Sequence, residues 1–237
     1  MLNTTTNKKM TKNSLLKILG TGIIATSIIL QPTFSYEKIF KYPLLINSYT
    51  SPSKERSPAK SGEYLKKKIL KKKLNTGKYT PKQTVELLEK GIKNGGGLPE
   101  KMDITFIYSL IEKESEWNPK AKSSVGARGL GQIMKGTWED YSPKRVYNDA
   151  YNPEKNLETV VKIINGHEEY FSTYHPNWSK LGKKEKLKIH IAAYNWGQRR
   201  IKDINFNLKN EKKIPLQTKN HIKRVMEIYE RINNEKA

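Results

Sequence analysis

Residues 104–134 of the chain read ITFIYSLIEKESEWNPKAKSSVGARGLGQIM, and this stretch determines the fold that we expect. Ile107, Leu110 and Ile111 recur at the spacing of one face of an α-helix, and Glu114 occupies the next position on that face. An ionised carboxylate is costly to bury, so a carboxyl on an apolar face tends to keep its proton, as a general acid must. The alternative is that Glu114 reaches water from the frayed last turn of the helix.

A glycine-rich loop is predicted to follow this helix. Asn118-Pro119 ends the helix, because the residue before a proline is pushed out of the α region. Glycines at 126, 129 and 131 allow sharp turns and close approach of the backbone to other groups. A phosphate-binding loop is disfavoured, because no strand precedes the run and no Gly-Lys-Ser/Thr follows it. We expect the loop to fold back over the end of the Glu114 helix and to line a groove.

Three groups of residues, in order along the chain, resemble the catalytic (SLT) domain of soluble lytic transglycosylases. They are Glu114-Ser115, the run from Asn118-Pro119-Lys120-Ala121 through Ser123 to GARGLGQIM at 126–134, and AYNWG at 193–197. These enzymes belong to the lysozyme-like superfamily and cleave bacterial peptidoglycan. The resemblance covers roughly residues 98–232 and implies an all-α, lysozyme-like domain with a substrate groove.

Hydrophobic periodicity independently predicts an all-α domain. Further helices are expected over 81–93, over a short segment at 132–141, from 153 onward, over 183–194 and over 218–233. Thr80-Pro81 supplies an N-cap oxygen and a first-turn proline for the first of these. No alternating strand pattern competes, and residues 144–150 are expected to form a small irregular or hairpin insertion.

The resemblance implies a mechanism with one carboxyl group. Glu114 would protonate the bond between N-acetylmuramic acid and N-acetylglucosamine, while the substrate's acetamido group stabilises the positive centre. The ionised Glu114 would then accept the proton of the muramic C6 hydroxyl as that oxygen attacks C1. The product is a 1,6-anhydro sugar, and neither a metal nor a cofactor is expected.

The resemblance also assigns roles around this acid. Ser115, Gly126 and Gly129 would be structural residues of the motif. Substrate-binding roles fall to Ser123, Gln132, Met134, Tyr194 and Asn195, with the Tyr194 hydroxyl orienting the Glu114 carboxyl. Tyr194 also fits a core aromatic on its helix face, and ordinary packing accounts equally well for Met134 and Trp138.

The chain departs from the family pattern at three places. Gly131 stands where methionine is usual, so a hydrophobic wall of the groove is expected to be missing or replaced. Gln198-Arg199-Arg200 replaces a common Pro-Gly, and His221 stands where a tyrosine is common. These changes bear on sugar subsites and leave the acid itself in place.

The segment before the catalytic domain is predicted to hold an export signal and a linker. Lys8, Lys9 and Lys12 precede an apolar run that ends at Pro32, so residues 1–35 are expected to be a signal peptide or membrane anchor. Residues 36–79 are expected to be a basic, largely unstructured linker, and residues 80–237 the catalytic domain. The chain would therefore be exported to the cell envelope, either secreted or anchored.

Charge and composition indicate the expected partners. The 237 residues carry a net charge of +22 and include no cysteine, which excludes disulfides and thiolate metal sites. Peptidoglycan strands are the expected substrate. The lysine-rich tract at 66–73 would attract an anionic wall polymer or membrane surface, as a solvated tether or a short amphipathic helix. Nucleic acid is not expected, because aromatic residues do not interleave with the lysines.

Two rival functions remain open. A hydrolase of the same fold would need a base for water, and Asp140 and Asp149 are the candidates. A non-catalytic wall-binding protein could retain the groove without the chemistry. The four histidines, at 167, 175, 190 and 221, lack paired-ligand spacing, and His167-Glu168-Glu169 is interpreted as a solvated helix face.

Overall fold

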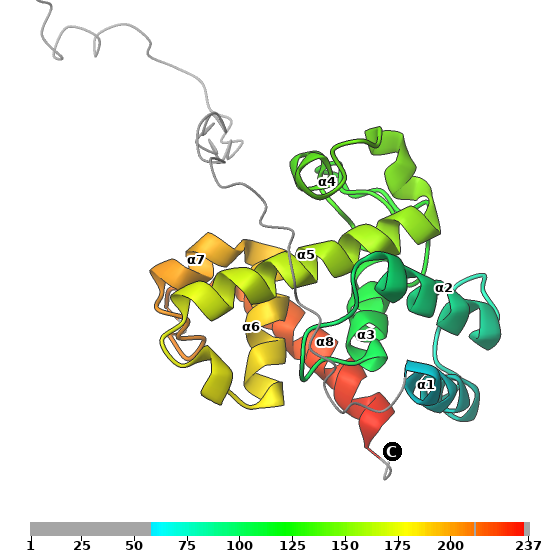
Figure 1. Ribbon diagram of the computed structural model, residues 1–237, viewed down its shortest axis with the longest axis horizontal. Coiled ribbons are helices and arrows are strands. Elements are labelled where there is room, and N and C mark those ends of the chain that lie inside the picture. The colour runs from blue at the N-terminus through cyan, green and yellow to red at the C-terminus, as the bar shows by residue number, and fades with distance from the viewer. Residues whose placement is uncertain (1–57, 211, 235–237) are drawn as a thin grey trace, which may run out of the picture. The chain divides into compact units, whose positions relative to one another are not determined.

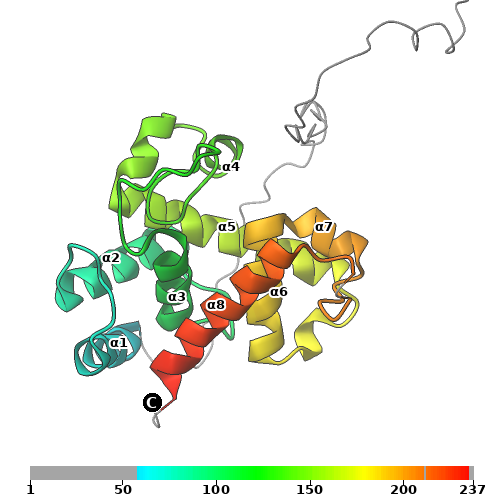
Figure 2. The same cartoon turned by 180° about the vertical axis from the view of Figure 1, so that it is seen from behind.

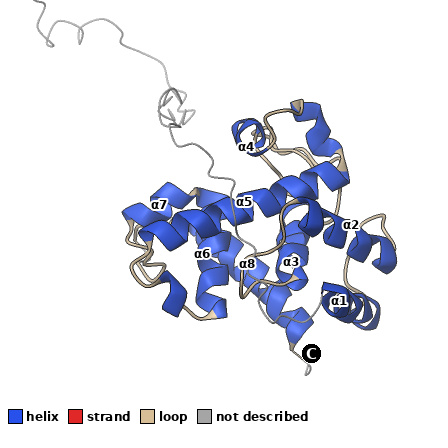
Figure 3. Cartoon of the chain, in the orientation of Figure 1, coloured by secondary structure: helices blue, strands red, loops and turns tan. Residues whose placement is uncertain are grey.

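The computed structural model describes residues 58–210 and 212–234, and every regular element in this part of the chain is a helix (Figure 1 and Figure 3). The prediction of an all-α domain is therefore confirmed for these residues. The elements in order are α1 (Pro58–Lys72), α2 (Pro81–Asn94), α3 (Ile104–Ser115), α4 (Lys135–Tyr141), η1 (Tyr147–Tyr151), α5 (Pro153–Tyr174), η2 (Trp178–Lys180), α6 (Lys183–Trp196), α7 (Gln198–Asp203) and α8 (Leu216–Asn233).

The predicted export signal and the first half of the predicted linker, together residues 1–57, lie outside the described residues. Within the described part, none of the helices combines the length and the apolar character that crossing a bilayer requires.

Several helices begin where short-range signals place them. At α2 the Thr80 hydroxyl accepts a hydrogen bond from the Gln83 backbone, and the Gln83 side chain accepts one from the Thr80 backbone, which is a capping box. The Asp103 side chain accepts from the Phe106 backbone nitrogen at α3, and Asn152 caps α5 in the same way before Pro153. Such interactions satisfy backbone donors that the first helical turn leaves free.

The central helix of the larger core is α3. Its residues from Ile104 to Ile111 are all buried, so the first two turns have no side that faces solvent. Figures 1 and 2 show α8 alongside it, and α1 and α2 also pack on it. Because its first two turns are enclosed by protein, the position of its C-terminal end, which carries Glu114, is well defined.

The prediction that residues 36–79 are largely unstructured is wrong for residues 58–72, which form α1. Leu65 and Ile69 lie one turn apart on one face and are 0% and 1% exposed in the core, while most lysines occupy the other faces. At Gly62 the helix lies so close to α2 that a Cβ atom would be 3.1 Å from Val85 Cγ1. The lysine-rich tract is therefore part of the domain, through an apolar face that packs against other helices.

A smaller core lies at the C-terminal end of α5, around Phe171, Trp178 and Ile201. Here Glu168 accepts hydrogen bonds from Trp178 Nε1 at 2.7 Å and Lys186 Nζ at 3.0 Å, and it lies 3.0 Å from His190 Nε2. The interpretation of residues 167–169 as a solvated face holds for the exposed Glu169 and is wrong for the other two. His167 is buried, and Glu168 contacts residues of both η2 and α6. The short helix α7, which periodicity did not predict, packs on this core.

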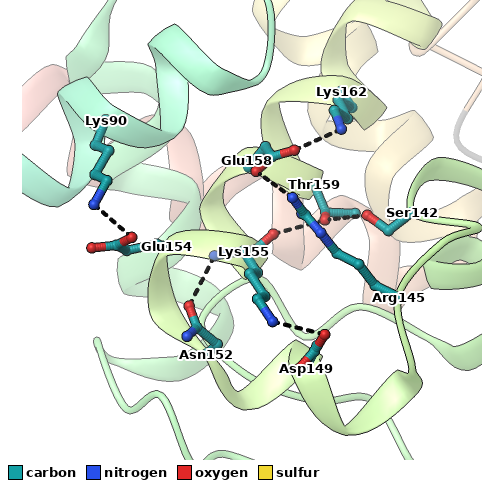
Figure 4. Close-up of polar contacts among 10 residues, drawn as sticks. All are labelled: Lys90, Ser142, Arg145, Asp149, Asn152, Glu154, Lys155, Glu158, Thr159 and Lys162. Carbon is teal, nitrogen blue, oxygen red and sulfur yellow. Dashed lines mark hydrogen bonds and ion pairs between the residues drawn. The ribbon is translucent and has the colours of Figure 1, made fainter.

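Polar contacts join η1 and the preceding turn to α5 (Figure 4). Glu158 accepts from Arg145 at 2.9 Å and from Lys162 at 2.7 Å, and the hydroxyls of Ser142 and Thr159 lie 2.8 Å apart. The insertion expected at 144–150 is present as the single 3₁₀ turn η1 rather than a hairpin. These contacts hold the segment on α5, where Tyr147 also contacts the glycine-rich loop.

Candidate active site

Glu114 lies in the last turn of α3. The helix ends at Ser115, earlier than Asn118-Pro119 suggested, because Glu116 and Trp117 both adopt left-handed backbone conformations with φ of 51° and 63°. The chain reverses there, and Trp117 packs in the core against Tyr108, with ring centroids 5.3 Å apart. Ser115 donates to the carbonyl of Ile111 at 3.4 Å. The buried indole of Trp117, three residues after Glu114, thus holds this reversal in place.

The Glu114 carboxyl is largely removed from water, with 15% of the side chain exposed. This burial raises the pKa of Glu114 from its ordinary 4.5 to about 7, against the opposing effect of the nearby Lys113 cation. A carboxyl with this pKa is partly protonated at neutral pH, so it can give a proton and take one back. The burial expected from the helical pattern is therefore present.

His221, on α8, approaches the same carboxyl. Its Nε2 atom lies 3.2 Å from Glu114 Oε1, and its side chain is 5% exposed. The two atoms are within ion-pair distance, yet their alignment does not satisfy a hydrogen bond, and Nε2 has no hydrogen-bond partner among the described residues. Burial, reinforced by Lys113, lowers the pKa of His221 to about 4, so the imidazole is neutral at pH 7.

The glycine-rich loop forms two tight turns joined by isolated β-bridges between Lys122 and Arg128 and between Arg128 and Ile133. The predicted structural glycines adopt positive φ angles, 91° at Gly126 and 75° at Gly129. At Gly129 a Cβ would also lie 2.0 Å from the carbonyl oxygen of Ala150, so this position requires glycine for space as well as for conformation.

Gly131 connects the loop to both neighbouring helices. Its backbone nitrogen donates to Asn156 Oδ1 at 2.7 Å, and its carbonyl accepts from the Tyr194 hydroxyl at 2.7 Å. A Cβ there would lie 2.3 Å from Val160 Cγ2, so a methionine has no room in this conformation. The expectation that Gly131 removes a hydrophobic wall from a groove is not supported, because this position faces the core.

The predicted substrate-binding residues of the loop divide into two kinds. Ser123 and Gln132 are half-buried and brace the loop itself: Ser123 Oγ accepts from the Ala127 nitrogen at 2.9 Å, and Gln132 Nε2 donates to the Gly129 carbonyl at 2.9 Å. Met134 is 44% exposed. Of these three, Met134 presents the most free surface to a ligand.

Tyr194 and Asn195 lie at the end of α6. The half-buried Tyr194 donates its proton to Gly131 rather than to Glu114; burial, and then the nearby Glu114 charge, raise its pKa well above the usual value. Asn195 Oδ1 accepts from the Thr218 hydroxyl at 2.9 Å, which joins the end of α6 to the first turn of α8. The hydrogen bonds place both residues as supports of the site; direct roles in binding substrate stay predictions.

Two residues that sequence reasoning did not assign complete this arrangement. Asn156 is fully buried on α5, where it accepts from Gly131 and donates to the carbonyls of Arg128 and Ala150 at 3.2 and 2.8 Å. A single amide on an otherwise apolar helix face was a signal for it. The Tyr147 hydroxyl lies 2.6 and 2.9 Å from the carbonyl oxygens of Gly126 and Ile133, a contact without a local sequence signal.

Two surface cavities lie near these elements. One, of about 380 Å³, is lined by Glu112, Lys113, Glu116, Arg224, Glu227, Ile228 and Arg231. The other, of about 410 Å³, is lined by residues that include Tyr79, Lys120, Asp149 and Tyr151. Glu114 lines neither of them, so the substrate groove along the acid stays a prediction.

Comparisons with known proteins match the part of the chain that holds these residues. A family model described as the Transglycosylase SLT domain matches residues 97–217. The soluble lytic murein transglycosylase of Escherichia coli (strain K12) is 32% identical over 101 residues, which are 41% of this chain and 14% of that protein. The membrane-bound lytic murein transglycosylase F of Saccharophagus degradans is 27% identical over 103 residues, 43% of this chain and 18% of that protein.

The matched segment therefore spans less than a fifth of the length of either relative. Among solved structures, the 70 kDa soluble lytic transglycosylase of Escherichia coli aligns with a TM-score of 0.45 and 22% identity, over 74% of this chain and 30% of that chain.

Proposed function

Because the chain belongs to the Transglycosylase SLT domain family, we propose that it cleaves peptidoglycan glycan strands with Glu114 as general acid and then general base. One observation carries this proposal: a carboxyl at the end of a buried helix, its pKa raised by burial to about 7. The related proteins are named murein transglycosylases, which points to the same polymer.

The proposed reaction needs one protein carboxyl. Glu114 gives its proton to the glycosidic oxygen between N-acetylmuramic acid and N-acetylglucosamine as the C1–O bond breaks, and the acetamido group of the substrate supports the cationic C1. The C6 hydroxyl oxygen then bonds to C1 while ionised Glu114 takes the hydroxyl proton. Glu114 ends protonated, no water is consumed, and the product carries a 1,6-anhydro ring.

The loop and α6 residues have supporting and contact roles in this proposal. Tyr194 and Asn156 hold Gly131, and through it the loop, against α5 and α6. Ser123, Gln132 and Met134 would face the sugars across a groove that begins at Glu114. Asn195, through Thr218, fixes the start of α8 beside the acid.

The test uses the full chain on purified peptidoglycan, with mass spectrometry of the soluble fragments. We expect 1,6-anhydro-muropeptides from the wild type and none from Glu114→Gln. Glu116→Gln is the matched control, because Glu116 is an exposed carboxyl two residues further on and should leave the products unchanged.

Other products would contradict the proposal in distinct ways. Reducing ends without anhydro sugars would indicate a hydrolase, and Asp140 and Asp149 would be examined as the base. Asp149 is engaged at 2.8 Å by Lys155 and lines a cavity that does not include Glu114, which favours the single-acid proposal (Figure 4). Binding to peptidoglycan without any release of fragments would indicate a wall-binding protein.

We also propose that the protein acts at the cell envelope and that the lysines of α1 attract it to an anionic wall polymer. Lys67, Lys71 and Lys73 are exposed, whereas Leu65 and Ile69 of the same segment are buried in the core. The main apolar face of α1 is thus not free to enter a bilayer, so attraction would act through charge. A phosphate-rich wall polymer fits this surface better than a lipid interior.

A further inference from the structure

The imidazole of His221 faces the Glu114 carboxyl across the contact between α3 and α8. The distance from Nε2 to Oε1 is 3.2 Å, and Nε2 is a buried polar atom without a hydrogen-bond partner among the described residues. A buried polar atom without a partner costs free energy, so its retention needs an explanation. Catalytic hydrogen bonds are often poorly aligned without substrate and become short and linear only in the complex.

A second His–Glu pair in the same chain shows what a purely structural pair looks like. Burial alone would raise the pKa of Glu168, but hydrogen bonds from His190 and Trp178, together with the Lys186 contact, outweigh it and lower that pKa. Glu168 is therefore held ionised by several donors. Glu114 faces one imidazole that is not aligned with it, and its pKa is raised. Both pairs bring a histidine Nε2 close to a glutamate oxygen, but the pKa of Glu168 is lowered and that of Glu114 is raised.

The fold controls where His221 lies and which groups face it. Thr218, one turn before His221 on α8, donates to Asn195 on α6 at 2.9 Å. From α3, the titratable groups near His221 are Glu114 and Lys113, and from α6, Tyr194 faces Glu114. α1 contacts the far end of α8, where Lys72 donates to the backbone carbonyls of Arg231 and Asn234.

Resting on the proposed function, we propose that His221 is a positioning residue for Glu114: its Nε2–H donates to Oε1, which leaves Oε2 to carry the transferred proton. Oε1 can accept this hydrogen bond in both the protonated and the ionised carboxyl. A neutral imidazole therefore holds the same carboxyl rotation through both proton transfers. It also stabilises the carboxylate, which opposes the effect of burial.

A titration of His221 tests the contact without any need for activity. Nitrogen-15 NMR of the histidine rings in the full chain should show the Nε2–H tautomer of His221 at neutral pH. Its Nε2 shift should change in a step near pH 7, as Glu114 ionises, and this step should disappear in Glu114→Gln. An Nδ1–H tautomer, or the same step in Glu114→Gln, would overturn the proposal whether or not the protein is an enzyme.

Turnover as a function of pH tests the role in catalysis. His221→Phe should lower kcat by about tenfold to a hundredfold, the range for a misplaced catalytic group, with little change in KM. The alkaline limb of this variant's pH profile should move to higher pH, because the Glu114 carboxylate has lost a hydrogen-bond donor and the pKa of Glu114 rises. In the wild type, the pH profile of turnover should have an acidic limb near pH 4, where His221 takes up a proton. His221→Tyr should restore kcat and lack this limb, because a phenol stays neutral at that pH.

The matched control is His190→Phe, which removes the other buried imidazole that faces a carboxylate. It should lower stability and leave the pH profile of turnover unchanged. An unchanged profile and kcat in His221→Phe would overturn the positioning role. A wild type that releases no anhydro products would instead contradict the proposed function, and the NMR titration would still decide whether the pair exists.

Discussion

At the scale of single residues, Glu114 is suited to chemistry at a cost in stability. Its pKa in the folded chain, about 7, lies above its ordinary 4.5, so the folded state binds a proton more tightly than the unfolded state. Such a group contributes its full stability below pH 4.5 and loses it as pH rises through 7. The loss is up to about 3 kcal/mol, at about 1.4 kcal/mol per pKa unit.

Glu114→Gln should therefore stabilise the protein at pH 8 by about 2–3 kcal/mol and have little effect at pH 4.5, because glutamine cannot ionise. The measurement is urea unfolding of both proteins across this range. The lowered pKa of His221 acts in the opposite sense, because stability is lost as pH falls from 6.5 to 4. Both proteins contain His221, so this effect cancels in the comparison. Equal stabilities at pH 8 would mean that the Glu114 carboxylate is solvated in the folded state.

The same residue scale shows what local patterns can and cannot predict. The burial of Glu114 follows from helical periodicity, because its neighbours one turn earlier are core residues. The position of Gly131 could not be predicted, because it depends on Val160, Asn156 and Tyr194, which approach from two other helices. Likewise, the sequence shows His221 only as a departure from the family pattern. Its 3.2 Å contact with Glu114 could not be predicted, because the two residues are 107 positions apart.

At the scale of secondary structure, α1 changes the definition of the domain. Leu65→Ala and Ile69→Ala should each lower the free energy of unfolding by about 2–4 kcal/mol, as large-to-small changes in a packed core do. Leu70→Ala is the matched control, because Leu70 is 59% exposed on the same helix and should change stability by less than about 0.5 kcal/mol. Chemical denaturation of the full chain measures all three. Near-zero effects at 65 and 69 would mean that α1 detaches in solution.

Local signals mark several of the helices that periodicity predicted. The starts of α2 and α5 carry cap residues and prolines that act within one turn, and α5 and α8 have apolar stripes several turns long. In α1 a few apolar residues stand among many lysines, and their burial depends on partners such as Val85 and Leu88. The six residues of α7 are too few to show a period.

At the scale of the whole molecule, the charge distribution leads to a prediction about wall binding. Lys67 and Lys71 of α1 and Lys73, which directly follows it, are exposed, and each charge near an anionic surface contributes about 1 kcal/mol. Changing all three to glutamine should weaken binding to a soluble teichoic-type polymer by about a hundredfold, at about 1.4 kcal/mol per factor of ten. Cleavage of short soluble glycan fragments should be unchanged, because the lysine whose charge acts on the Glu114 carboxyl is Lys113 and not one of these three.

The control for this prediction removes the same charge elsewhere. Lys209, Lys212 and Lys213 are exposed between α7 and α8, and their triple change to glutamine leaves the same net charge. If α1 forms the binding surface, this control keeps most of its polymer affinity and the α1 variant loses it, with the difference shrinking as salt screens the charges. Equal losses would assign the attraction to net charge, and retained binding by both would remove the anionic polymer as a partner.

Binding of vesicles with anionic headgroups, measured in parallel, separates attraction to lipid from attraction to polymer. If the α1 variant no longer bound vesicles but still bound the polymer, the preference for polymer that we argued from the buried face of α1 would be reversed.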